Sequence, residues 1–129
     1  MLRSIYLIVL SSIIFGDVAL AQFSGGPASA NKVSLTHRTI QHIIDRHWPN
    51  SPAEGAGKFL PGVTEDSLRQ MIDESVANGQ VRPNTNGRAG EIFEYDFQRA
   101  IGTGTRGEPA TRLRVVVSPR NKVVTAFPF

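Results

Sequence analysis

The sequence predicts an α+β fold in which two N-terminal helices pack on an antiparallel sheet of three or four strands. Apolar residues recur at helical spacing over residues 35–48 and 64–78, whereas apolar and polar residues alternate over residues 92–97 and 112–117. Helical patterns come first and strand patterns follow, joined by hairpin-like turn signals. This order indicates an α+β domain with the helices covering one face of the sheet.

The start of the chain predicts a secretory signal peptide over residues 1–21. A basic start and an apolar run over residues 5–15 precede small residues that favour cleavage after Ala21. The run is shorter than the roughly 20 residues that span a bilayer, so we expect no stable membrane span after cleavage, an uncleaved anchor being the alternative. Residues 22–31 predict a flexible leader, and residues 32–129 predict the folded domain.

The composition describes one small, basic domain without disulfides. Removal of residues 1–21 takes away one positive and one negative charge, so the mature chain keeps the formal net charge of +3. The absence of cysteine excludes thiol catalysis and zinc fingers and, in an exported protein, favours a bacterial origin. Arginine outnumbers lysine eleven to three. This excess favours an anionic ligand because the planar guanidinium matches phosphate, although a solvated basic face is the alternative.

The first helix is predicted from Leu35 to Trp48, where Pro49 ends it. At 100° per residue, His47 lies near the centre of the apolar stripe formed by the isoleucines, while His42 and Arg46 lie on the opposite side. One histidine therefore faces the domain interior and the other need not.

The second helix follows a loop over Asn50–Pro61 that is rich in glycine, proline and serine. Thr64 is its predicted N-cap, acidic residues occupy its first turn, and Asn78-Gly79 ends it. Its apolar face consists of Leu68, Met71, Ile72 and Val76. It carries no obvious chemistry, so we interpret it as scaffold.

Strand patterns begin at Gln80. A short segment over residues 80–82 precedes an Asn-Gly turn signal and the alternating strand over residues 92–97. The glycine-rich segment 102–109 lacks the lysine and the strand-then-helix context of a P-loop, so it is predicted to be a mobile loop between strands. The last two strands cover residues 112–117 and 122–127, joined by a turn.

Two of the three histidines, His42 and His47, lie within six residues of each other, with Arg46 beside them. Histidine exchanges protons near neutral pH, so the pair could supply both an acid and a base. A metal site is disfavoured because His37, His42 and His47 are each five residues apart and point about 140° away from one another on a helix, and no cofactor is expected. No serine lies in a nucleophile-elbow sequence, which disfavours a serine hydrolase.

Metal-independent RNA cleavage fits these residues. The ribose 2′-hydroxyl is the nucleophile, so the protein supplies only a base, an acid and cations for the phosphate. The alternatives are a hydrogen-bonded core histidine for His47 and a solvated histidine for His42. The spacing alone leaves both open.

Several short motifs together resemble the bacterial EndoU-like ribonucleases, within the group that also contains barnase, the colicin-type tRNases and RelE. Such domains occur as the C-terminal toxins of contact-dependent inhibition and polymorphic toxin systems. The motifs that carry the resemblance are His42–His47, Gly57-Lys58-Phe59, Gly87–Gly90, Leu113–Pro119 and Val124–Pro128. They span essentially the whole of residues 32–129.

The resemblance implies a fold, an activity and a set of site residues. It implies two helices on an antiparallel sheet and cleavage of RNA, often tRNA, to a 2′,3′-cyclic phosphate. It implies that His42 and His47 are the acid–base pair and that the Thr125 hydroxyl binds phosphate. It also implies that Arg46, Lys58, Arg88, Arg114 and Tyr95 contact the substrate. The alternatives are a turn residue for Arg88 and a solvent-facing strand position for Arg114. Tyr95 would stack on a base, and core packing is its alternative.

The sequence thus predicts a secreted, metal-independent endoribonuclease, acting as an antibacterial toxin in the cytoplasm of a target cell. The expected partners are RNA, with tRNA favoured, and a small acidic immunity protein, and the expected state is a monomer. A non-catalytic exported binding module for an anionic polymer or protein partner is the alternative. If both histidines are catalytic, the first helix is expected to end or bend before His47.

Overall fold

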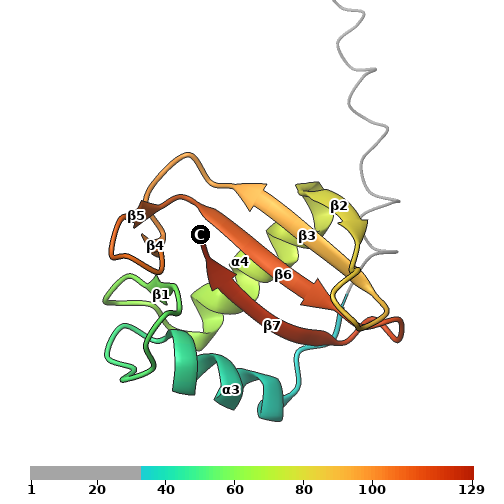
Figure 1. Cartoon of the computed structure of the whole chain (residues 1–129), viewed down its shortest axis with the longest axis horizontal. Helices are drawn as coiled ribbons and strands as arrows, with labels where there is room; N and C mark the ends of the chain where they lie inside the picture. The colour runs from blue at the N-terminus through green and yellow to red at the C-terminus, as the bar shows by residue number, and fades with distance from the viewer. Residues whose placement is uncertain (1–32) are drawn as a thin grey trace, which may run out of the picture. The chain divides into compact units, whose positions relative to one another are not determined.

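The computed structural model describes residues 33–129, so the signal peptide predicted over residues 1–21 and the leader over 22–31 lie outside the described residues. This part of the chain contains two helices and seven strands (Figure 1). In chain order they are α3 (His37–His47), β1 (Lys58–Phe59), α4 (Glu65–Asn78), β2 (Gln80–Pro83), β3 (Glu91–Asp96), β4 (Gly102–Thr103), β5 (Pro109–Ala110), β6 (Arg112–Val117) and β7 (Val123–Pro128). The strands form two antiparallel sheets, in the orders β2-β3-β6-β7 and β1-β4-β5.

The prediction of two N-terminal helices on a single sheet of three or four strands is wrong. The structure has seven strands in two sheets, α3 begins only at His37, and β1 lies between the two helices. Each strand of the smaller sheet is two residues long, too short for the alternation that reveals a strand in a sequence. The segment predicted as a mobile loop is instead a paired hairpin, in which Gly104 N donates to Glu108 O at 2.7 Å.

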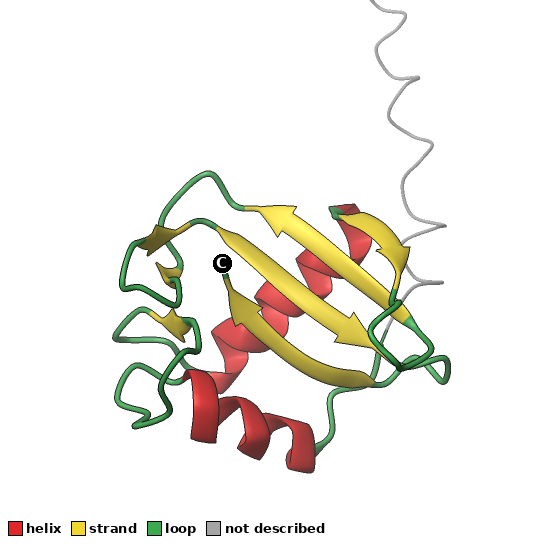
Figure 2. Ribbon diagram, viewed as in Figure 1, coloured by secondary structure: helices red, strands yellow, loops and turns green. Residues whose placement is uncertain are grey.

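Helix α4 covers one face of the four-stranded sheet and forms the core with it. Its N-terminus is closed by a capping box, in which Ser67 N donates to Thr64 Oγ1 at 3.1 Å and Thr64 N donates to Ser67 Oγ at 2.9 Å. The helix packs against β3 and β6, and it crosses behind them in Figure 2. The residues buried between them include Leu68, Ile72, Val76, Phe93, Leu113 and Val115.

Helix α3 lies along the edge strand β7 and is attached at both ends (Figure 2). At its N-terminus, Thr39 Oγ1 donates to Val123 O at 2.9 Å. The preceding Ser34 donates from its backbone N to Asn121 O and accepts from Val123 N, the first residue of β7. At its C-terminus, His47 bonds to the loop before β1. These attachments hold α3 beside the sheet face that α4 does not cover. Neither described helix is long and apolar enough to cross a membrane.

The open face of the sheet is polar and aromatic. Glu94, Arg114 and Phe127 are cross-strand neighbours on β3, β6 and β7, and Val116 pairs with Thr125. Paired residues share one face of a sheet, so these side chains lie together on the side away from α4. The open face therefore brings charged, aromatic and hydroxyl side chains of three strands beside α3.

Candidate functional site

A cavity of about 410 Å³ opens where α3, the loop before β1, the β4–β5 hairpin and the ends of β6 and β7 meet. Five of the eight site residues predicted from the sequence line it: His42, Arg46, His47, Arg114 and Thr125. They come from one helix and two strands, and the sheet register and the attachments of α3 bring them together. We take this cavity as the candidate active site.

His47 is buried, with 5% of its surface exposed, and its orientation is fixed on two sides. Its Nδ1 lies 2.8 Å from Gly57 O, and its ring stacks on Phe127 with the centroids 5.3 Å apart. A carbonyl oxygen only accepts hydrogen bonds, so Nδ1 carries the proton. In the neutral ring Nε2 is then the unprotonated nitrogen, which is the form that accepts a proton.

The environment of His47 favours this neutral form. Burial is the main cause that lowers the pKa of His47 below its ordinary value of 6.5, and the hydrogen bond to Gly57 opposes the shift. The nearby charges of His42, Arg46 and Lys58 lower this pKa further. His47 is therefore uncharged and able to act as a base at neutral pH.

His42 is exposed and meets His47 edge-on, with the ring centroids 6.2 Å apart. The helix does not end or bend before His47, the condition expected if both histidines are catalytic, because α3 runs through His47 and Trp48 is its C-cap. The two rings still border one cavity. Both histidines are among the residues that line it.

Arg114 is held over two aromatic rings by an ion pair. Its Nε donates to Glu94 Oε2 at 2.6 Å, and its Cζ lies 4.2 Å from the Phe129 centroid and 5.7 Å from that of Phe127. Arg82 Nη2 donates to the same carboxylate oxygen at 3.1 Å. Burial raises the pKa of Glu94, but the two arginines outweigh it and hold that pKa below 4.5, so the carboxylate stays charged. Among residues 33–129, the two terminal nitrogens of Arg114 donate to no partner and remain available to a ligand.

Thr125 presents a hydroxyl that is buried at the wall of the cavity. Its Oγ1 has no hydrogen-bond partner among the described residues. An unpartnered buried hydroxyl costs about 1–3 kcal/mol, so such groups call for an explanation. A bound ligand that accepts a hydrogen bond from Thr125 would supply one.

Three predicted residues do not line the cavity. Lys58, on β1, donates from Nζ to Ala53 O, although its charge still acts on His47. Arg88 is exposed in the turn between β2 and β3. Tyr95 packs edge-on against Phe97, with the centroids 4.8 Å apart, on the face of the sheet that α4 covers.

Sequence reasoning missed nine of the residues that line the cavity, among them Gly57, Glu108, Phe127 and Phe129. The alternation of β7 could have found the two phenylalanines, because residues 125, 127 and 129 share one face of a strand. Gly57 has a steric reason to be glycine, since a Cβ there would collide with Pro128 O. Glu108 gives no signal in the sequence, because only the β4–β5 hairpin brings it to the cavity.

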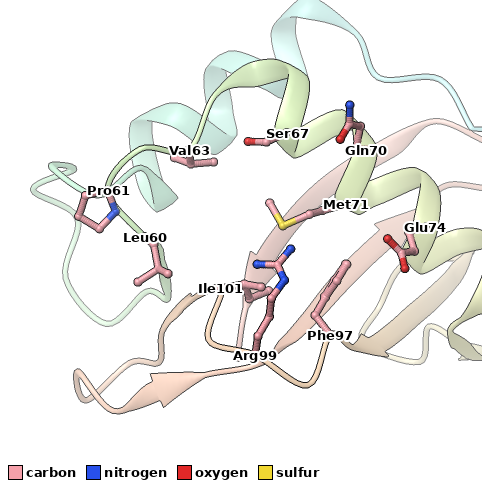
Figure 3. A pocket seen from close by; sticks show the side chains of 10 residues that line it. All are labelled: Leu60, Pro61, Val63, Ser67, Gln70, Met71, Glu74, Phe97, Arg99 and Ile101. Carbon is pink, nitrogen blue, oxygen red and sulfur yellow. The ribbon is translucent and has the colours of Figure 1, made fainter.

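A second cavity, of about 200 Å³, lies between α4 and the segment that follows β3 (Figure 3). Its walls are mainly apolar, and Figure 3 shows Arg99 beside Phe97, facing Met71 and Glu74 of the helix. None of the residues that line it is a histidine. Of these two cavities, only the larger one is lined by histidines, His42 and His47.

No group of three or more histidine, aspartate or glutamate side chains within residues 33–129 is arranged to hold a metal ion. Comparisons with protein-family models, curated proteins and solved structures gave no match. The resemblance to EndoU-like ribonucleases therefore stays a prediction.

Proposed function

We propose that the domain is a metal-independent endoribonuclease that cleaves RNA to a 2′,3′-cyclic phosphate. One observation carries this proposal: two histidines, an arginine with free terminal nitrogens and an unpartnered hydroxyl border a single cavity. These are the groups that cleavage by the ribose 2′-hydroxyl requires, namely a base, an acid and donors for the phosphate.

The protonation of His47 assigns the roles. Its unprotonated Nε2 takes the proton of the 2′-hydroxyl as the O2′–P bond forms. His42, the other imidazole at the cavity, donates a proton to the 5′-oxygen as the P–O5′ bond breaks. Arg114 and Thr125 donate to the phosphate oxygens, where negative charge builds up. Arg46, at the cavity wall, adds a positive charge near the same phosphate.

The biological setting completes the proposal. We infer that an exported ribonuclease acts on RNA in another cell, as a secreted antibacterial toxin, with tRNA as the favoured substrate. The producing cell then needs an immunity protein, and an acidic one complements the net charge of +3. The alternative, a non-catalytic binding module, uses the arginines of the open face but assigns no role to the neutral His47.

Cleavage of total RNA and purified tRNA in excess EDTA tests the proposal. We expect the mature protein to cut RNA, and His47→Asn and His42→Asn to be at least about 100-fold slower. His37→Asn is the matched control, because His37 is exposed on the first turn of the same helix and does not line the cavity. No cleavage by the wild type would contradict the ribonuclease proposal, and loss of cleavage in EDTA would contradict the metal-independent mechanism.

A further inference from the structure

The stack of rings and guanidinium groups at the cavity continues past it to Arg112. Phe129 lines the cavity, and the Cζ atoms of Arg114 and Arg112 each lie 4.2 Å from its ring centroid. Arg112 is exposed at the start of β6 and is the backbone hydrogen-bond partner of Phe129. The cation–π contact limits the directions in which this long side chain can point. Arg112 is thus held at the rim of the site while its charged group stays accessible.

Arg112 is not engaged in an ion pair with any of the described residues. Arg114 shares Glu94 with Arg82, so these three groups together carry a single positive charge. Asp96 is the cross-strand neighbour of Arg112, yet its Oδ1 accepts from Gln98 N at 2.8 Å. Within residues 33–129, no ion pair joins Arg112 to any carboxylate. Arg112 thus has an acidic cross-strand neighbour in Asp96, but no ion pair with it holds the guanidinium away from a phosphate.

The spacing of the two arginines suits a nucleic-acid strand. Arg112 and Arg114 are two residues apart on one face of β6, which separates their Cα atoms by roughly 7 Å. Neighbouring phosphates of an extended single strand are separated by a similar distance. A phosphate at Arg114 thus leaves the next phosphate of the strand within reach of Arg112.

We propose that Arg112, seated on Phe129, forms a second phosphate subsite beside the cleavage cavity. The preferred substrate is then an RNA strand that carries a phosphate next to the one being cleaved, rather than an isolated dinucleotide. This inference rests on the proposed ribonuclease activity, and it adds the requirement for a neighbouring phosphate.

Arg99 provides a matched control for the charge and for the aromatic contact. Its Cζ lies 5.6 Å from the Phe97 centroid, so it makes the same kind of contact as Arg112 and carries the same charge. It borders the second cavity, whose walls lack acid–base histidines (Figure 3). Neutralising Arg99 therefore changes the net charge equally without touching the proposed subsite.

The test uses the dinucleotide whose internal phosphodiester bond the protein cleaves. It compares this dinucleotide with the same molecule carrying an extra terminal phosphate, at either the 5′ or the 3′ end. Each molecule has one cleavable bond, so the ratio of kcat/KM with and without the extra phosphate measures the subsite. We expect the wild type to favour one of the two phosphorylated forms by about twofold to fivefold, as for an exposed charge pair. Arg112→Gln should bring this ratio close to one, Arg112→Lys should retain most of it, and Arg99→Gln should keep the wild-type ratio.

Each outcome decides a separate point. A wild type that cuts these substrates with no preference for either extra phosphate would overturn the subsite and leave the ribonuclease proposal standing. A preference that survives in Arg112→Gln, or that falls equally in Arg99→Gln, would also overturn it. A wild type that cuts neither these substrates nor longer RNA would overturn the ribonuclease proposal and the subsite with it.

Discussion

The two faces of strand β6 have opposite roles, although their residues alternate along one short segment. Leu113, Val115 and Val117 are buried against α4 and the rest of the core. Arg112 and Arg114 point to the open face, where both contact the ring of Phe129 and Arg114 lines the cavity. The covered face stabilises the fold, whereas the open face holds groups that a ligand would use. Substitutions at adjacent residues of β6 should therefore change either the free energy of unfolding or the rate of RNA cleavage, depending on the face to which the residue belongs.

The open face also carries features that do not serve stability. Thr125 has a buried hydroxyl without a partner, and His47 is buried in a position that disfavours its charged form. By contrast, the buried polar side chain of α4, Ser75, is satisfied, because it donates to Met71 O at 2.8 Å. Unsatisfied groups in a folded domain cluster where function requires them.

His47→Asn should produce the largest effect on the open face. We expect kcat/KM to fall about 1,000-fold, equivalent to about 4 kcal/mol, because the amide can still donate to Gly57 O but cannot accept the proton. Steady-state cleavage of RNA measures the rate, and a thermal melt shows that the variant folds. A folded variant that keeps the wild-type kcat/KM would remove His47 from the mechanism.

Leu113→Ala should produce the largest effect on the covered face. The side chain is fully buried, so we expect the free energy of unfolding in urea to fall by about 3 kcal/mol. Cleavage by the folded fraction should stay near the wild-type rate. Val116→Ala, half-buried on the other face of the same strand, is the control and should cost clearly less. Equal losses in the two variants would contradict the division between the faces.

Arg114→Ala should lower activity and leave stability nearly unchanged, the reverse of Leu113→Ala. We expect kcat/KM to fall about 30-fold, or about 2 kcal/mol, because a donor to the phosphate is lost. The free energy of unfolding should change by less than about 1 kcal/mol, since the ion pair is partly exposed. Arg82→Ala is the matched control. Arg82 is the other ion-pair partner of Glu94, and Arg82 does not line the cavity. An equal loss of activity in both variants would mean that Arg114 acts only through the ion pair.

Thr125→Val should increase stability while lowering activity. Removal of an unpartnered buried hydroxyl should raise the free energy of unfolding by about 1 kcal/mol. Cleavage should slow, and Thr125→Ser, which keeps the hydroxyl, should restore most of it. A valine variant that is less stable than the wild type would show that the hydroxyl contributes to the fold itself.

The pH dependence of stability should show a smaller effect of His47. Its pKa is lowered in the folded protein, so below pH 6.5 the unfolded chain binds a proton that the folded protein does not. The free energy of unfolding should fall as the pH drops from above 6.5 towards 4.5, below which protonation of Glu94 starts to contribute. Urea titrations of the wild type and His47→Asn measure the difference. A wild-type curve as flat as that of the variant over this range would contradict a lowered pKa.

The long elements of the fold could be predicted because their patterns repeat. Helix α4 and strands β3, β6 and β7 lie close to their predicted bounds, since a period of 2 or 3.6 shows clearly over six or more residues. The smaller sheet could not be predicted, because each of its strands has two residues and depends on contacts between distant segments. That sheet changes the architecture from one sheet to two.

The candidate site likewise has features that the sequence predicted and features that it did not. The apolar stripe of the first helix predicted that His47 points inward, and the structure confirms it. The ion pair from Glu94 to Arg114 and the hydrogen bond from His47 to Gly57 O left no trace in the sequence. Both join segments that only the tertiary fold brings together. They are also the contacts that set the orientation and protonation of the site.

The most direct test of the open face as a catalytic site is the end group of its product. We expect residues 22–129, in excess EDTA, to cut an RNA oligonucleotide and leave a 2′,3′-cyclic phosphate, detected by mass spectrometry. The same oligonucleotide with 2′-deoxyribose at the cut position should stay intact, because it lacks the hydroxyl whose proton His47 takes. Cleavage of the deoxy-substituted strand, or a product without the cyclic phosphate, would contradict the account.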